Sequence, residues 1–198
     1  KDDILDYAPV VKQNRKRGRM SMAELAQAAV EVSDNSAANL LLPMLGGPPG
    51  FTAFVRAHGD DVTRLDRTEP TLNENAQDDP RDSSSPAAMA MLMARLIFTD
   101  MKPQSADRLR AWLNASSTGD ARIKAGLPEG WSSGSKTGTC SNAYNDVALV
   151  KSPGGEEYIL AIYLDRPTAN KAASEGAIAE TARAALDFIA KAQKSGVE

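Results

Sequence analysis

The hydrophobic pattern of this chain changes partway along its length, and that change limits the folds open to it. Up to about residue 116, apolar residues recur at helical spacing, and the expected helices span Ser21–Glu31, Asp34–Leu45, Pro86–Phe98 and Ala106–Leu113. The later pattern is that of strands, at Trp131–Cys140, Asp146–Lys151 and Tyr158–Leu164, before a last helix over Ala172–Ala192. This order predicts an α/β (α+β) fold. Residues 1–116 would form an all-α subdomain, and residues 117–198 the carboxyl-terminal part of an α/β subdomain, a sheet flanked by helices.

Turns and breakers divide these elements. Ser21 followed by Glu24 predicts a capping box at a helix start. The stretch Gly46–Gly50 contains two prolines and predicts a helix stop and turn. Residues 59–85 are rich in Asp, Asn, Pro and Ser, which predicts a long irregular loop of the kind that usually carries function. Because Tyr158–Leu164 shows little polar alternation, we expect further strands to cover both of its edges.

Composition excludes several classes of function. The chain has 198 residues, 42% apolar and 25% charged, and a net charge of −3, so it lacks the basic field of a nucleic-acid-binding protein. No apolar run is long enough to cross a membrane. One His and one Cys are too few for a zinc site of the usual ligands, and a Ser-His-Asp triad would have to use His58, at the end of a helical stretch. We therefore expect no metal and no cofactor.

Three short motifs stand far apart in the chain. They are Ser33-Asp34-Asn35, Glu69-Pro70-Thr71-Leu72-Asn73 and Lys136-Thr137-Gly138. In this order and at these spacings they resemble the class A β-lactamases, serine enzymes that hydrolyse penicillin-like antibiotics. The stretches Ala37–Leu42 and Thr63–Arg67 extend the resemblance over nearly the whole chain. The resemblance implies a fold like that of the serine β-lactamases and penicillin-binding proteins, with an antiparallel sheet that includes amino-terminal strands.

The nucleophile of that family lies in a Ser-x-x-Lys motif upstream of Ser-Asp-Asn, and no such motif precedes Ser33. Ser133–Lys136 fits the letters, but it contains Gly and leads into a strand, whereas the motif needs a helical turn to bring its Ser and Lys together. We therefore expect the nucleophile to come from a missing amino-terminal segment of the same enzyme. We also expect residues 1–198 alone neither to hydrolyse a β-lactam nor to fold stably.

Opening a β-lactam requires a proton donor for the leaving nitrogen and binding groups for the substrate. The resemblance implies that Ser33 relays the proton and that Asn35 binds the substrate's side-chain carbonyl. Taken alone, Ser33 is typical of a helix N-cap, or of part of one with Asp34. The resemblance further implies that Lys136 supplies positive charge, that Thr137 offers a hydroxyl to the substrate carboxylate, and that Gly138 lets the substrate approach the strand closely.

Glu69 and Asn73 lie four residues apart, so one helical turn puts both on one side. A carboxylate and an amide together can hold one water for attack on an ester, and the resemblance implies that this pair positions the deacylating water. Without the other motifs, Glu69 would be taken for a surface residue before a proline. Asn39, on the second expected helix, can point toward the loop and hold Glu69. In the family, the residues matching Arg67 and Asp82 form an ion pair that closes the loop.

The resemblance also assigns residues around the third motif. The main-chain N–H of Thr139 would form half of an oxyanion hole. Cys140 resembles the carbapenem-hydrolysing subgroup, whose matching Cys forms a disulfide with a Cys beside the nucleophile, although a lone Cys is usually a buried apolar residue. Since no Arg follows the third motif in the next strand, the carboxylate-binding role passes to Arg122, with Lys124 as the competing cation. Tyr7 matches an aromatic residue at the cleft rim, or else is a half-buried loop residue.

These implications describe a periplasmic or secreted bacterial enzyme. It would hydrolyse the amide of penicillins, cephalosporins and, as in the resembled subgroup, carbapenems, through an acyl-enzyme. A DD-peptidase (penicillin-binding protein) shares most of the chemistry but lacks the Glu-x-x-x-Asn loop, and a non-catalytic β-lactam sensor stays acylated, so Glu69 and Asn73 argue against both. The expected partners are a small β-lactam and the missing amino-terminal segment. We expect a monomer that binds neither nucleic acid nor membrane.

Overall fold

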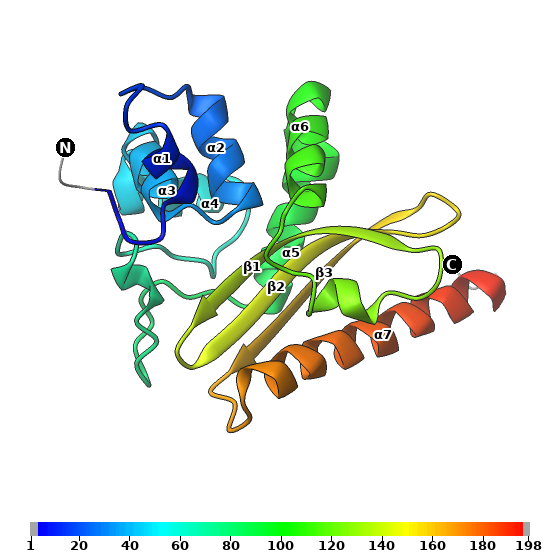
Figure 1. Ribbon diagram of the computed structural model, residues 1–198. Coiled ribbons are helices and arrows are strands. Elements are labelled where there is room, and N and C mark those ends of the chain that lie inside the picture. The colour runs from blue at the N-terminus through cyan, green and yellow to red at the C-terminus, as the bar shows by residue number, and fades with distance from the viewer. Residues whose placement is uncertain (1–3, 196–198) are drawn as a thin grey trace.

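The computed structural model describes residues 4–195 and places helices on both faces of a three-stranded sheet (Figure 1). The strands are antiparallel neighbours in chain order: β1 (Ser132–Cys140), β2 (Ala143–Lys151) and β3 (Glu157–Asp165). Within β1, Lys136 lies opposite Val147, and Thr137 lies opposite Asp146. Because successive side chains of a strand point to opposite faces, Lys136 and Thr137 project from opposite sides of the sheet.

The helix α7 (Lys171–Ser195) runs across one face of the sheet (Figure 1). The buried aliphatic residues between helix and sheet form one cluster: Ile123, Ala148, Val150, Ile178, Ala182 and Leu186. The three residues that α7 contributes recur at every fourth position, so they form one stripe along the helix. The sequence-based prediction of a final helix is therefore confirmed.

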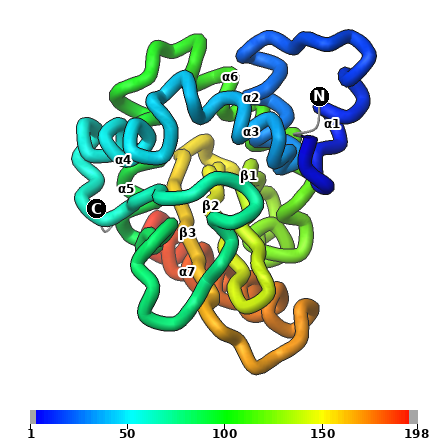
Figure 2. Tube along the Cα trace, turned by 90° about the vertical axis from the view of Figure 1, so that its left-hand side faces the viewer, coloured from blue at the N-terminus to red at the C-terminus, as the bar shows by residue number. Residues whose placement is uncertain are grey.

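The helices α5 (Pro86–Arg95) and α6 (Pro103–Asn114) pack on the sheet from its other side, against β3 and β1 respectively. The remaining helices gather near β1 (Figures 1 and 2): α1 (Pro9–Gln13), α2 (Met22–Glu31), α3 (Asn35–Leu41) and α4 (Gly47–Ala57). All six helices precede residue 117, but two of them contact the sheet directly. The division into subdomains at residues 116 and 117 therefore stays a prediction.

Local sequence explains where several helices begin and end. The capping box is confirmed, because Ser21 Oγ accepts from Glu24 N at 3.2 Å and Ser21 N donates to Glu24 Oε2 at 2.7 Å. The expected helix over Asp34–Leu45 is interrupted: α3 gives way to a 3₁₀ turn over Leu42–Leu45, whose Pro43 lacks the N–H that an α-helix interior requires.

Two predicted boundaries were wrong. The predicted helix stop at Gly46 is confirmed, since the 3₁₀ turn ends at Leu45 and Gly46 has a φ of 88°. The turn expected over the rest of Gly46–Gly50 is wrong, because α4 begins at Gly47. The two prolines lie in the first helical turn, where backbone N–H groups have no intrahelical partner, so the missing N–H costs nothing. The second strand starts at Ala143 rather than Asp146, because pairing with β1 continues to the tight turn after Cys140.

The loop over residues 59–85 lies at the end of the sheet where β1 turns into β2 (Figure 2). Its regular element is a 3₁₀ turn, Thr71–Asn73. Two side-chain amides attach the loop to the sheet: Asn142 Nδ2 donates to Asn75 O at 2.9 Å, and Asn75 Nδ2 donates to Asp165 Oδ1 at 2.8 Å. The loop therefore has a defined position against the strand ends.

One edge of β3 pairs with β2 over all nine of its residues. Among residues 4–195, no strand pairs with the opposite edge. The expectation that both edges of Tyr158–Leu164 are covered is therefore not met within the described part of the chain. Every residue of this apolar segment is half-buried, and its outer backbone N–H and C=O groups are open to another strand.

The cluster under α7 gives a stability test. Leu186 is 0% exposed, and replacing it with Ala should lower the free energy of unfolding of the whole protein by about 2–5 kcal/mol, through lost burial and a residual cavity. The neighbouring Asp187 is exposed, so Asp187→Ala should change it by less than about 0.5 kcal/mol. Chemical denaturation of both variants measures the difference. Equal effects would contradict this packing.

Candidate functional site

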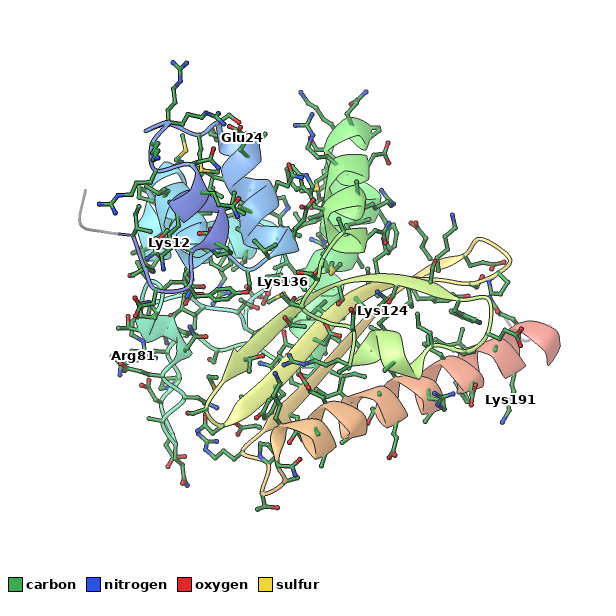
Figure 3. All side chains as sticks on the ribbon, in the orientation of Figure 1. Lys12, Glu24, Arg81, Lys124, Lys136 and Lys191 are labelled. Carbon is green, nitrogen blue, oxygen red and sulfur yellow. The ribbon has the colours of Figure 1, made fainter. Side chains whose placement is uncertain are left out.

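The third motif meets the first where the helices approach β1. Figure 3 shows Lys136 at this junction. Its Nζ donates to Ser33 Oγ at 2.6 Å and to the carbonyl oxygen of Thr137 at 2.5 Å. The chain thus brings together two side chains that are 103 positions apart. An ammonium group that donates to a hydroxyl oxygen leaves the hydroxyl proton free for another acceptor.

The residue that caps α3 is Asp34, not Ser33. Asp34 Oδ1 accepts from Ala37 N at 2.9 Å, and its Oδ2 accepts from Val10 N and Val11 N at 2.9 and 3.0 Å. Ser33 itself has a φ of 58°, in the left-handed region that non-glycine residues rarely adopt. Ser33 is therefore not an ordinary helix cap, and the Ser33 hydroxyl is free to bind Lys136.

The second motif is held by an amide clamp. Asn39 Nδ2 donates to the carbonyl oxygen of Glu69 at 2.8 Å, and Glu69 N donates to Asn39 Oδ1 at 2.9 Å. Asn73 Nδ2 donates to Glu69 Oε2 at 2.7 Å, across the 3₁₀ turn. The contact between Glu69 and Asn73 is the one that their four-residue spacing predicts, and Asn39 holds Glu69 through its backbone groups. The Glu69–Pro70 peptide bond is cis.

The charged groups of the two motifs influence each other. Burial raises the pKa of the Glu69 carboxyl above its ordinary value, while the Asn73 amide and the positive charge of Lys136 lower it. Burial lowers the pKa of Lys136, while the carboxylates of Glu69 and Asp146 raise it. A carboxylate with a raised pKa is a stronger base toward water, so Glu69 lies in an environment that suits a general base.

Arg67 and Asp82 join the two ends of the loop. Arg67 Nε donates to Asp82 Oδ2 at 2.5 Å, and the Asp82 side chain is only 3% exposed. Asp82 Oδ1 also accepts from the backbone N–H groups of Asp66 and Arg67 at 2.7 and 2.9 Å. Arg67 in turn donates to Glu74 Oε2 at 2.6 Å. Removing either partner would leave a poorly solvated charge and unpaired backbone donors.

Three hydroxyl groups lie near the outer edge of β1. Thr137 Oγ1 donates to Thr118 Oγ1 at 2.8 Å, and Thr139 Oγ1 accepts from Arg122 Nη2 at 2.6 Å. The Arg122 side chain is only 3% exposed, and it also pairs with Glu175 Oε1 at 3.2 Å. Its Nη1 donates to the carbonyl oxygens of two paired strand residues, Gly138 and Asn145. The Arg122 guanidinium therefore contacts the outer edge of β1 by its hydrogen bond to the Thr139 hydroxyl.

The other predicted site residues are more open. Gly138 and Thr139 are exposed along β1, and the Tyr7 side chain is 53% exposed beside the first motif, where its carbonyl oxygen accepts from Asn35 N at 3.1 Å. Cys140 is a free thiol whose Sγ donates to Asn142 Oδ1 at 3.1 Å, so its disulfide stays a prediction. Lys124 pairs with Asp120 at 2.7 Å on the exposed surface, away from these hydroxyls.

Sequence reasoning missed three residues that shape this region, Thr118, Asp146 and Glu175, and considered Asp34 only as part of a cap with Ser33. The usual preference of Asp for helix N-caps was a usable signal for Asp34. The others had no local signal, because their partners lie in distant segments: Thr118 bonds Thr137, and Glu175 bonds Arg122. Among residues 4–195, no three His, Cys, Asp or Glu side chains gather as ligands for a metal ion.

Comparison with known proteins agrees with this geometry. The sequence profile of the β-lactamase enzyme family matches residues 1–189. The chain is 42% identical over 192 residues to the β-lactamase FAR-1 of Nocardia farcinica, covering 96% of this chain and 61% of that protein. It is 40% identical to the carbapenem-hydrolysing β-lactamase KPC of Klebsiella oxytoca, covering 96% of this chain and 65% of that protein. The chain thus spans less than two thirds of these curated relatives.

Solved structures show the same fold. A reconstructed class A β-lactamase, that of the last common ancestor of Gram-negative bacteria, superposes with a TM-score of 0.92 at 45% identity, covering 96% of this chain and 72% of that chain. The predicted α/β (α+β) fold of the serine β-lactamase type is confirmed.

The pH dependence of stability tests the burial of Asp146. Burial raises the pKa of this carboxyl from 3.8 to about 6. The folded state therefore holds the proton more tightly than the unfolded chain, and this contribution to stability, complete below pH 3.8, is lost as the pH rises through about 6. Asp146→Asn cannot ionise, so its stability relative to the wild type should increase by about 3 kcal/mol between pH 3 and pH 8.

Denaturation of the whole protein across this range measures the effect, with exposed Asp187→Asn as the control that shows none. A stability difference that is constant with pH would show that Asp146 ionises normally.

Proposed function

Since the chain belongs to the class A β-lactamase family, we propose that the whole protein hydrolyses the strained amide of β-lactam antibiotics through an acyl-enzyme. The observation that carries this proposal is the Glu69–Asn73 pair, at 2.7 Å, facing the Lys136–Ser33 pair. The first pair supports hydrolysis of an ester, and the second supports protonation of a leaving nitrogen. An enzyme that opens and then releases β-lactams needs both activities.

Acylation begins when a serine outside residues 1–198 gives its hydroxyl proton to the Lys of its own Ser-x-x-Lys motif and attacks the lactam carbonyl carbon. The C–N bond breaks, and the leaving nitrogen takes a proton from the Ser33 hydroxyl. The Lys136 ammonium, 2.6 Å from Ser33 Oγ, stabilises the transient alkoxide until the proton released by the nucleophile restores the Ser33 hydroxyl. We assign the main-chain N–H of Thr139, on the edge strand β1, the role of donating to the carbonyl oxygen as it gains negative charge.

Deacylation uses the loop. Glu69 removes a proton from a water that its carboxylate and the Asn73 amide hold, and the resulting hydroxide attacks the ester carbonyl. The serine then leaves as the ester C–O bond breaks, and it takes the proton back from Glu69. Asn39 fixes the backbone of Glu69 at both N–H and C=O, so the carboxylate keeps its position during turnover. The Arg67–Asp82 ion pair also keeps the Glu69 carboxylate in position, because it closes the loop.

We assign substrate binding to the edge of β1 and to the first motif. The hydroxyls of Thr137 and Thr139 bind the substrate carboxylate, and Asn35, whose side chain has no hydrogen-bond partner among residues 4–195, binds the substrate's side-chain carbonyl. Arg122 contributes its positive charge from behind Thr139 and orients that hydroxyl. Tyr7 borders the cleft from the helical side.

The proposed substrates are penicillins, cephalosporins and carbapenems. Carbapenems are included because Thr139-Cys140 matches the carbapenem-hydrolysing subgroup and because a relative of that name is 40% identical. The proposed disulfide of Cys140 belongs to the same subgroup. We assign the protein to the periplasm or the extracellular space; in the part of the chain that the structure describes, no helix has the length and apolarity to cross a membrane.

Additional amino-terminal strands are the proposed partner of the open edge of β3, because an apolar strand with one unpaired edge favours such pairing. We further propose that the protein acts as a monomer. Neither a DD-peptidase nor a β-lactam sensor requires a carboxylate–amide pair held like Glu69 and Asn73, and this pair favours turnover over both alternatives.

Loss of Glu69 should separate the two chemical steps. In the whole protein, Glu69→Ala should still acylate with a penicillin but deacylate slowly, because the water loses its base. Mass spectrometry should show the acyl adduct accumulating while steady-state turnover falls by roughly 100-fold or more. Exposed Glu129→Ala serves as the control and should turn over normally. Undiminished turnover in the Glu69 variant would remove this residue from the mechanism.

Loss of Arg122 should weaken the use of substrates that carry the carboxylate. Arg122→Ala should reduce kcat/KM by roughly 1.5–3 kcal/mol, the range for a hydrogen bond to a charged group. The methyl ester of the same β-lactam should be affected much less, since it lacks the charge. Lys124→Ala, which removes a cation paired only with Asp120 among the described residues, should have no comparable effect. A larger loss in Lys124→Ala would transfer the role to that residue.

A further inference from the structure

A buried carboxylate that the mechanism does not use lies at the centre of the sheet. Asp146, in the middle of β2, is 0% exposed. It stands opposite Thr137 on one side and Ile162 on the other, so all three side chains project from the same face, the one that α7 covers. The same face carries the aliphatic cluster under α7, including Ile123 and Ala148. Burying an ionisable group among them costs stability, which an aliphatic residue would avoid.

The Asp146 carboxylate contacts the backbone next to Arg122. Asp146 Oδ2 accepts from Ile123 N at 3.2 Å, and the hydroxyl of Ser135 donates to the same carboxylate. Asp146 Oδ1 is buried without a hydrogen-bond partner among the described residues. Ile123 directly follows Arg122 in the chain. The carboxylate therefore ties the backbone that carries Arg122 to the centre of the sheet.

The same segment passes close to the sheet at its other end. A Cβ atom on Gly119 would lie 2.5 Å from Ser135 Oγ, so a side chain there would force Ser135 or the segment to shift, and 3.7 Å from Asp146 Oδ2, in ordinary contact. Thr118, the residue before it, accepts from Thr137 Oγ1. Residues 118–123 thus form a bridge that meets the sheet at Thr118 and at Arg122.

We propose that Asp146 is a positioning residue that holds the 118–123 segment so that Thr118 and Arg122 align the hydroxyls of Thr137 and Thr139 for the substrate carboxylate. This inference rests on the proposed function of that edge. An aliphatic residue at position 146 would leave the Ile123 N–H and the Ser135 hydroxyl buried and unpaired. The charge of Asp146 is balanced by Arg122 on its own face and Lys136 on the other, while Glu175 pairs with Arg122 from α7.

The experiment compares two substitutions in the whole protein. Asp146→Ala removes the acceptor, whereas Asp146→Asn keeps an amide oxygen that can accept from Ile123 N. We measure kcat/KM for a β-lactam with a free carboxylate and for its methyl ester. Asp146→Ala should lower the preference for the carboxylate by roughly tenfold, the effect of misplacing a binding group, and Asp146→Asn should recover most of it.

The chain offers a matched control in Asp60. It is also buried, at 5% exposed, its Oδ1 accepts from the N–H groups of Val62 and Thr63, and its Oδ2 has no partner among the described residues. Asp60→Ala should lower stability without changing the preference for the carboxylate. The same selective loss in Asp60→Ala, or no rescue by Asp146→Asn, would overturn the proposal.

A second measurement does not depend on β-lactam turnover. Amide hydrogen exchange at Ile123 should be faster in Asp146→Ala than in the wild type and near normal in Asp146→Asn. If the wild type hydrolyses no β-lactam, the proposed function fails, while exchange still reports whether Asp146 holds the segment. Should Asp146→Ala not fold, Gly119→Ala, which pushes the segment away from Ser135, should produce the same selective loss. Unchanged exchange and preference in the folded variants would refute the positioning role.

Discussion

The hydrogen bond from Lys136 to Ser33 is the contact on which the rest of the site depends. It joins the middle of the edge strand β1 to the turn before α3, two segments from opposite parts of the chain. Ser33 can take part only because Asp34 caps the helix and holds three backbone N–H groups, which leaves the serine in a left-handed conformation. Local strain at Ser33 is thus offset by a buried carboxylate next to it.

The long loop shows how an irregular segment acquires a single conformation. It has few regular hydrogen bonds of its own, so its order comes from side chains that bind backbone groups. Asn39 binds both backbone groups of Glu69, and Asp82 binds two backbone N–H groups together with the Arg67 guanidinium. Each of these side chains satisfies polar groups that would otherwise lie partly buried and unpaired. The position of Glu69 therefore follows from contacts made outside its own turn.

Two buried charges of opposite sign lie on one side of β1. Arg122 and Asp146 both lie within the face that α7 covers, where isolated charges are expensive. Arg122 uses five hydrogen bonds to carbonyl, hydroxyl and carboxylate oxygens, so its charge is retained without water. Asp146 is less well satisfied, which is why burial dominates its pKa. The free-energy cost of burying these two charges therefore arises beneath the strand edge that carries Thr137 and Thr139. A fixed geometry at this edge is useful for binding.

The sequence alone determined the elements and groups whose signals are local. Hydrophobic spacing predicted most of the helices, though not α1, and the three strands, and the four-residue spacing of Glu69 and Asn73 predicted their contact, because one turn of backbone is enough to bring them together. The sequence-based prediction failed just after Gly46, where the prolines fit the first turn of α4. Only the tertiary structure decided that Arg122 is buried behind Thr139 and that Asp146 and Thr118 brace the same edge. Those contacts join segments far apart in the chain, and residue spacing carries no information about which distant backbone a buried polar group will meet.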